Sequence, residues 1–318
     1  MRAKAAGGCK DPWAIVLAAG RGQRLARLTR ALYGRDVPKQ FAALDGEQTF
    51  LQQTMIRAAR LSPTERTVVV VAEEHASLAR SQLSAFPAAL VVEQPRDVGT
   101  LPGLLLPLAH VLDADPRARV IVYPADHHVQ RLGPFVEAVG SAVNAIDRAP
   151  SRTVLVGARA DRAATDLGWI LRGQSLEESG ILSAVEHFVE KPGSNVAARL
   201  LEAGALWNTL LIAMDGGAFW SKALASRPEL AHSFQRYRSA VATPNESVVR
   251  HEIYERLPTL DLSRDLLSNE RGLAVVEMAD AGWSDCGTPE RLFECLEVNG
   301  DLGGLLRRLG ATGLEISP

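Results

Sequence analysis

Two glycines and two basic residues near the start of the chain could together bind a phosphate. Gly20 and Gly22 follow a short apolar run, and Arg24 and Lys39 come shortly after them. Because glycine has no Cβ, its backbone can adopt positive φ and bring N–H groups close to a triphosphate. Arginine offers a planar fork that matches phosphate oxygens, whereas lysine acts as a mobile point charge. A lone G-x-G also occurs in ordinary strand-to-helix turns, and neither dinucleotide-fold nor P-loop spacing is present.

Two aspartates that follow predicted strands could bind Mg²⁺. Asp126 comes directly after the apolar run at 120–123, and Asp285 comes shortly before a predicted helix. Thr288, with Pro289 at the first helical position, is the better N-cap, which leaves Asp285 free for a metal. Mg²⁺ in nucleotide sites usually takes one or two carboxylates beside phosphates and waters. The alternative for Asp126 is that it caps a turn.

Further polar residues extend this candidate site. Lys191 ends another strand-like run after Glu190 and could meet a second phosphate, or the two could form a solvated ion pair. Asn208 could hydrogen-bond a polyol, or it could simply occupy a turn. His127 and His128 point to opposite faces of an extended segment, so structural roles are favoured over zinc binding.

The elements that position these residues alternate through the first half of the chain. Strands are expected at 67–71, 89–92 and 120–123, and helices at 49–61, 74–86 and 99–112. Repeated βα units predict a parallel sheet. In such sheets ligands bind outside the carboxyl ends of the strands, where both 18–24 and 124–128 fall.

The second half is expected to extend the same sheet. Strands are predicted near 153–158, 168–171, 185–189, 206–214 and 273–278, and helices near 291–298 and 302–309. No linker, repeat or low-complexity segment separates the halves. We therefore expect an N-terminal tail (1–12), one catalytic domain (13–290) and a C-terminal helical extension (291–318).

Composition favours a globular protein that acts on small anions. The chain has 318 residues, of which 47% are hydrophobic and 23% charged, with a net charge of −2. The sequence contains no block of Lys and Arg residues, which argues against a nucleic acid as the main partner. Three cysteines without C-x-x-C spacing indicate neither a disulfide framework nor a zinc site, so a reducing cytoplasm is expected. The apolar run at 13–19 is too short for a secretory signal or a membrane helix.

In their order, these motifs resemble those of the sugar-nucleotide pyrophosphorylases, and within them the mannose-1-phosphate guanylyltransferase family. The resemblance runs from about Trp13 to Glu290. The matching segments are Leu17-Ala18-Ala19-Gly20-Arg21-Gly22-Gln23-Arg24-Leu25, Pro38-Lys39-Gln40-Phe41, Pro124-Ala125-Asp126-His127, Phe188-Val189-Glu190-Lys191-Pro192, Trp207-Asn208 and Trp283-Ser284-Asp285-Cys286-Gly287.

The resemblance implies a Rossmann-like nucleotidyltransferase fold with a mixed, mostly parallel central sheet flanked by helices. It implies that GTP and mannose 1-phosphate react to give GDP-mannose and pyrophosphate. The catalytic residues would be Arg24 and Lys39 on the triphosphate, Asp126 on Mg²⁺ and Lys191 on the sugar phosphate, with Asp285 as a second metal ligand. The nucleotide would lie against Leu17, Ala18, Ala19, Gly20, Gly22, Gln94, Arg96, Gly99 and Thr100, and the sugar against Gly168, Glu190 and Asn208. The expected partners are a nucleoside triphosphate and a sugar 1-phosphate, and a homodimer is the expected assembly if the chain associates.

The chain departs from the family pattern mainly at the sugar motifs. Leu210 stands where the family commonly has the glycine of Trp-Asn-Ser-Gly, and Ser263 stands where it often has the aspartate of Ser-Ile-Asp-Tyr. Nucleotidyl transfer is therefore indicated more firmly than mannose. The alternatives are a cytidylyltransferase of isoprenoid precursor synthesis and a non-catalytic subunit that binds nucleotide sugars.

Overall fold

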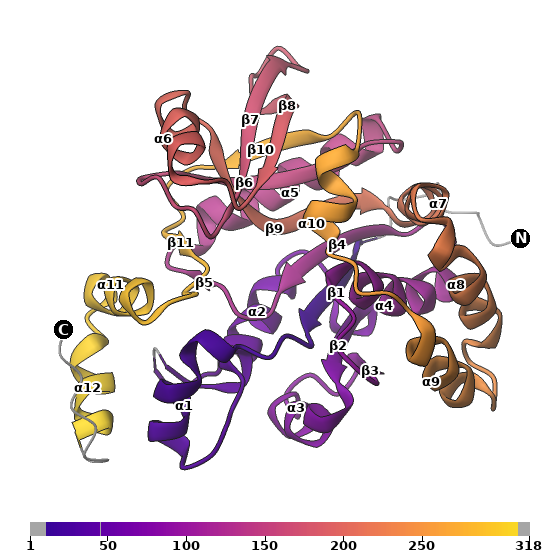
Figure 1. Cartoon of the computed structure of the whole chain (residues 1–318), viewed down its shortest axis with the longest axis horizontal. Helices are drawn as coiled ribbons and strands as arrows, with labels where there is room; N and C mark the ends of the chain where they lie inside the picture. The colour runs from indigo at the N-terminus through magenta and orange to yellow at the C-terminus, as the bar shows by residue number, and fades with distance from the viewer. Residues whose placement is uncertain (1–10, 45, 311–318) are drawn as a thin grey trace, which may run out of the picture.

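The computed structural model describes residues 11–44 and 46–310, and within them nine strands form one sheet (Figure 1). The order across the sheet is β3-β2-β1-β4-β9-β6-β10-β8-β7. These strands are β1 (Trp13–Ala18), β2 (Thr67–Ala72), β3 (Leu90–Gln94), β4 (Arg119–Pro124), β6 (Thr153–Arg159), β7 (Gly168–Ser175), β8 (Leu182–Glu190), β9 (Leu206–Asp215) and β10 (Ala274–Met278). The two halves of the chain thus share one sheet, as the sequence predicts.

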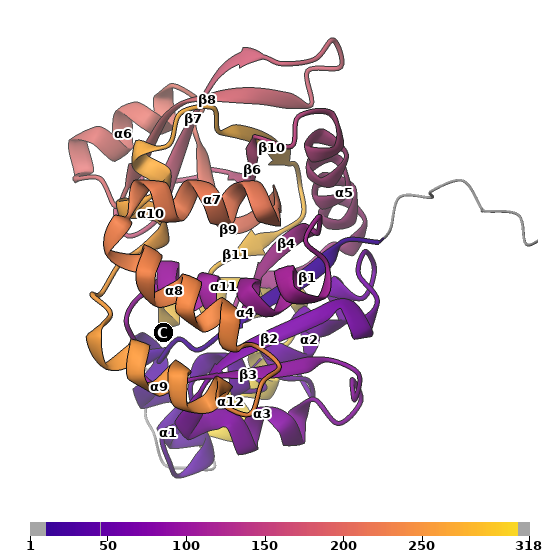
Figure 2. The same cartoon turned by 90° about the vertical axis from the view of Figure 1, so that its right-hand side faces the viewer.

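Helices cover both faces of the sheet, because successive residues of each strand enter opposite cores. On β1, Ala14 and Val16 belong to one buried cluster and Ile15 to the other. The helices that contribute to the first cluster are α1 (Ala26–Tyr33), α2 (Phe50–Ala58), α3 (Ala76–Gln82), α5 (Leu132–Arg148), α11 (Pro289–Asn299) and α12 (Leu302–Gly310). Those of the second are α4 (Thr100–Ala114), α7 (Gly216–Ser226), α8 (Pro228–Ala240), α9 (Glu246–Arg256) and α10 (Leu262–Asp265), of which α7, α8 and α9 lie together beside α4 (Figure 2).

The mixed sheet with flanking helices is confirmed, but parallel pairing predominates only in the N-terminal half. The described parallel pairs are β1–β2, β1–β4, β2–β3 and β6–β10. The C-terminal half is mainly antiparallel, in the pairs β4–β9, β6–β9, β7–β8, β7–β9 and β8–β10. The turn between β7 and β8 is too short to cross over, so these strands reverse direction. The pattern of alternating elements did not indicate this reversal.

The remaining elements are short. They are α6 (Ser194–Glu202), a second sheet of β5 (His128–Val129) and β11 (Trp283–Ser284), and 3-10 helices at Gln23–Leu25, Lys39–Phe41, Thr64–Arg66, Glu73–His75 and Leu267–Asn269. Thr288 caps α11 as expected, because its side chain accepts a hydrogen bond from the amide of Arg291. No helix in the described part of the chain is long and apolar enough to span a membrane.

The predicted division into domains stays a prediction. Its boundary after Glu290 falls inside α11, which begins at Pro289. Most of the predicted tail, residues 1–10, and the last part of the predicted extension, residues 311–318, lie outside the described residues.

Candidate phosphate-binding site

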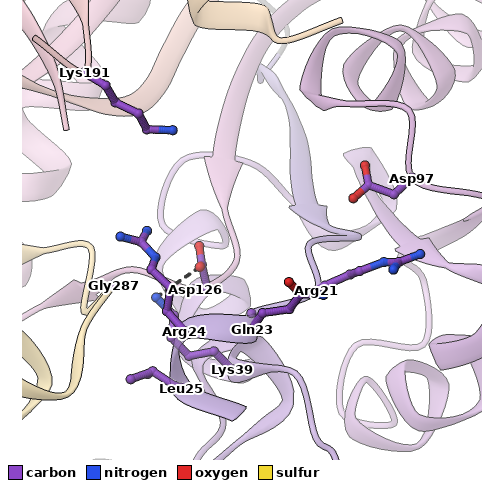
Figure 3. A pocket seen from close by; sticks show the side chains of 10 residues that line it. Arg21, Gln23, Arg24, Leu25, Lys39, Asp97, Asp126, Lys191 and Gly287 are labelled. Atoms are coloured by element: carbon purple, nitrogen blue, oxygen red, sulfur yellow. Dashed lines mark ion pairs between the residues drawn. The ribbon is translucent and has the colours of Figure 1, made fainter. Parts of the chain in front are cut away.

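A cavity of about 790 Å³ opens where β1 and β4 end (Figure 3). The two strands are parallel, with Leu17 opposite Pro124, so the loops that follow them leave the same edge of the sheet. The lining residues come from these loops and from four other segments: Arg21, Gly22, Gln23, Arg24, Leu25, Lys39, Asp97, Asp126, Lys191 and Gly287. The structure therefore brings together all four residues predicted to be catalytic.

Gly22 is required by the shape of the loop after β1. Its φ is 58°, and a Cβ there would lie 2.7 Å from the backbone nitrogen of Lys39. The side-chain amide of Gln40 supports the same loop, because its Nε2 donates to the carbonyls of Ala18 at 2.8 Å and Gly20 at 2.6 Å. The loop and the Pro-Lys-Gln segment are thus packed as one unit.

The sequence suggested that Lys39 acts as a mobile charge, but in the structure its side chain is buried and held by several partners. Its Nζ donates to the carbonyls of Asp285 at 2.5 Å and Cys286 at 3.3 Å. It also forms an ion pair with Asp126 Oδ2 at 3.0 Å, drawn as a dashed line in Figure 3. With a side chain only 4% exposed, this ammonium is a preorganised charge at the floor of the cavity.

Asp126 keeps an ionised carboxylate facing the cavity. Burial acts to raise its pKa, but the charge of Lys39 and a hydrogen bond from Lys39 outweigh burial and hold the pKa below its usual value. Burial lowers the pKa of His127, which favours a neutral ring, and its Nδ1 accepts a hydrogen bond from Trp283 at 3.3 Å. His128 instead pairs with Asn299, so both histidines have structural partners.

Asp285 reaches the site through the small second sheet but does not present a free carboxylate. The pairing of Ser284 with His128 brings the two aspartate loops together. The carboxylate lies 2.9 Å from Arg291 Nε and 3.8 Å from Arg24 Nη2, and its side chain is 9% exposed. Asp285 is thus engaged by these guanidinium groups, and its expected role as a second metal ligand stays a prediction.

The site fits Mg²⁺ through one protein carboxylate. No group of three or more His, Cys, Asp or Glu side chains among the described residues is arranged to hold a metal ion. Asp126, with 38% of its side chain exposed in the cavity, suits an ion whose other ligands are phosphate and water oxygens. Asp285 could serve as a second Mg²⁺ ligand if its ion pair with Arg291 opened.

The three residues predicted to bind a sugar do meet. Gly168 pairs with Glu190 across β7 and β8, and a Cβ on Gly168 would lie 2.7 Å from Glu190 Oε2 and 3.1 Å from Asn208 Cβ. Burial raises the pKa of Glu190, although nearby Lys191 opposes this effect. The exposed Lys191 projects toward the cavity from the side opposite Lys39 (Figure 3).

A second cavity of about 500 Å³ adjoins the first and shares Gly22, Asp97 and Asp126 with it. Most of the predicted nucleotide residues line it, namely Leu17, Ala19, Gly20, Gly22, Gln94, Gly99 and Thr100. Ala18 and Arg96 do not. Ala18 is buried under the loop, and Arg96 donates to the carbonyls of Tyr254, Glu255 and Leu257, which ties the segment after β3 to the end of α9.

Several residues at the site were missed from the sequence. Asp97 lines both cavities, and Asp166 and Arg291 form ion pairs beside Arg24. Asp166 and Arg291 are 125 residues apart, so no local pattern joins them. Leu210 was noticed in the sequence, because it stands where the family commonly has a glycine. Its φ of 56° shows that the backbone keeps the conformation suited to glycine.

Residues 13–299 match the family model of nucleotidyl transferases. The chain is 30% identical over 290 residues to mannose-1-phosphate guanylyltransferase of Escherichia coli K12, covering 88% of this chain and 59% of that protein. It is 27% identical to xanthan biosynthesis protein XanB of Xanthomonas campestris pv. campestris B100, covering 91% and 60%. The chain thus spans about 60% of the length of these curated relatives.

Solved structures give the same fold. A Thermus thermophilus protein described as mannose-1-phosphate geranyltransferase is 28% identical with a TM-score of 0.75, covering 87% of this chain and 77% of that chain. A Helicobacter pylori protein described as mannose-6-phosphate isomerase is 19% identical with a TM-score of 0.67, covering 86% and 99%. At that lower identity the second likeness bears on the fold alone.

Proposed function

The chain belongs to the nucleotidyl transferase family, and from that premise we propose that it transfers a guanylyl group from GTP to mannose 1-phosphate and releases pyrophosphate. The observation that carries the proposal is the cavity in which Arg24, Lys39 and Lys191 surround the ionised Asp126. The guanine base and the mannose are taken from the names of the relatives that the chain resembles.

The reaction needs charge and positioning more than proton transfer. An oxygen of the sugar phosphate attacks the α-phosphorus of GTP, a new P–O bond forms, and the bond to the β-phosphate oxygen breaks. The attacking oxygen is already anionic, so no general base is required. Lys39 and Arg24 would neutralise charge on the triphosphate, and Lys191 would hold the sugar phosphate on the opposite side for in-line attack.

Mg²⁺, when bound through Asp126, would supply further charge neutralisation at the phosphates. Lys39 would keep that carboxylate ionised and oriented through its ion pair at 3.0 Å. Glu190, Asn208 and Gly168 would receive the sugar, since they meet at the Lys191 side of the site.

We also propose that the protein works in the cytoplasm. Its association into a homodimer stays a prediction.

A substrate panel tests this function. The purified chain would be incubated with Mg²⁺, each of the four common nucleoside triphosphates and several sugar 1-phosphates, and pyrophosphate release would be measured. We expect the fastest release with GTP and mannose 1-phosphate. Fastest turnover with CTP would favour the cytidylyltransferase alternative, and no release with any pair would favour a nucleotide-sugar-binding subunit.

A further inference from the structure

Arg24, to which the proposed function assigns the triphosphate, is held by an ion pair from a distant loop. Its Nη1 donates to Asp166 Oδ2 at 2.8 Å, and Asp166 lies between β6 and β7. The Arg24 side chain is 56% exposed and stands on a short 3-10 helix. A long exposed arginine ordinarily samples many rotamers, so a fixed partner reduces the entropy lost when it binds an anion.

Asp166 is itself fixed by a bidentate pair with Arg291 of α11. Arg291 Nη1 donates to Oδ1 at 2.8 Å, and Nη2 donates to Oδ2 at 2.5 Å. Arg291 is only 12% exposed and also lies 2.9 Å from Asp285 through its Nε. The hydrogen bonds from Arg291 are the main cause that lowers the pKa of Asp166, which therefore stays ionised.

The loop at Gly287 is shaped to admit both guanidinium groups. A Cβ on Gly287 would lie 2.8 Å from Arg291 Nη2 and 2.9 Å from Arg24 Nη2. Gly287 and Arg24 line the main cavity, as Figure 3 shows, whereas Arg291 lines a separate, smaller cavity. Arg291 is thus placed to act on a ligand through Asp166.

We propose that Asp166, held by Arg291, is a positioning residue that orients Arg24 toward the phosphates of the nucleotide. This inference rests on the proposed function. The charge balance is compatible with it, because Arg24 and Arg291 together balance Asp166 and Asp285, so the network presents no net negative charge to the ligand. A carboxylate without Arg291 would instead repel the triphosphate.

The chain offers a matched control for this network. Arg162 forms a bidentate pair with Glu294, with distances of 2.9 and 2.8 Å. That pair joins the same two segments, the loop between β6 and β7 and helix α11, but neither residue lines the main cavity. A merely structural role in holding α11 to the loop would therefore be shared by Asp166 and Glu294.

The test compares Asp166→Asn with Glu294→Gln. Binding of GTP and of inorganic pyrophosphate would be measured by calorimetry, together with KM for each substrate and the midpoint of thermal unfolding. We expect Asp166→Asn to weaken GTP and pyrophosphate binding about tenfold and to leave KM for the sugar phosphate unchanged. Glu294→Gln should leave both affinities unchanged, and Asp166→Glu should restore part of the loss.

A double-variant cycle shows whether Asp166 acts through Arg24. In an Arg24→Gln background, Asp166→Asn should cause no further loss of affinity. An equal loss in both backgrounds, an unchanged affinity in Asp166→Asn, or the same affinity loss in Glu294→Gln would overturn the inference.

The binding measurements separate this inference from the proposed function. Wild-type chain that binds GTP but never releases pyrophosphate would contradict the proposed reaction, and the variants would still decide the role of Asp166. Wild-type chain that binds neither GTP nor pyrophosphate would overturn both.

Discussion

At the scale of single residues, Leu210 carries a backbone conformation that suits glycine better. Its φ is 56°, and its amide is held by Asn208 Oδ1 at 3.1 Å. Left-handed backbone costs a non-glycine residue about 1–2 kcal/mol. Leu210 lies beside the proposed sugar residue Asn208 and lines the nucleotide cavity.

We expect Leu210→Gly to be more stable than Leu210→Ala by about 1 kcal/mol. Both variants lose the leucine packing, so their difference isolates the backbone strain. The free energy of unfolding would be measured in urea. Ala213 on the same strand is fully buried with ordinary φ and provides the control, since Ala213→Gly should destabilise the chain. Leu210→Ala being equal to or more stable than Leu210→Gly would contradict the prediction.

Glu190 should make stability fall as pH rises. Burial raises its folded pKa above the ordinary 4.5, so the folded state holds its proton to higher pH than the unfolded state. Stability is therefore unaffected well below 4.5 and declines as pH rises from 4.5 through the folded pKa. In Glu190→Gln this decline should be absent, as measured by urea unfolding across that range. If the free energy of unfolding changed with pH in the same way in the variant and the wild type, the prediction for Glu190 would be wrong.

At the scale of elements, the small sheet of β5 and β11 brings the two aspartate loops together. Trp283 of β11 lies edge-on to His127 with ring centroids 5.2 Å apart, and its Nε1 donates to the same ring. The position of Asp126 relative to Lys39 and Asp285 thus depends on two strands of two residues each.

Trp283→Phe should keep the ring packing but lose the hydrogen bond to His127. We expect kcat to fall about tenfold, because displacement of the Asp126 loop weakens charge stabilisation in the transition state. The free energy of unfolding should fall by about 1 kcal/mol. Trp220→Phe is the control, since Trp220 is buried in α7 away from the main cavity and should affect stability alone. An unchanged kcat in Trp283→Phe would refute the role of the small sheet.

The elements that the sequence predicted are those with strong local patterns. Strands such as β2, with its five consecutive buried residues, have a signal that needs no distant partner. The pairing of β5 with β11 and the reversed direction of β9 could not be read locally, because each depends on segments far apart in the chain. The same limit hid Arg291, whose partner Asp166 precedes it by 125 residues.

At the scale of the whole molecule, one sheet edge collects the chemistry from the entire chain. The loop at Gly22 and the carbonyl of Asp285 meet at Lys39, which bonds to a residue 246 positions away. The glycine loop and Asp126 were predicted to converge because parallel strands share their carboxyl ends. The pairing of Asp126 with Lys39 and of Asp285 with Arg291 could be seen only in the completed fold.

The position of β10 has a consequence for how the chain folds. Residues 274–278 enter the sheet between β6 and β8, which precede them in sequence by about a hundred residues. Until that late strand docks, β6 and β8 each present an open edge of unpaired backbone groups to other chains. We therefore expect aggregation during synthesis to depend on this insertion, which joins β6 to β8 only after residues 274–278 have emerged.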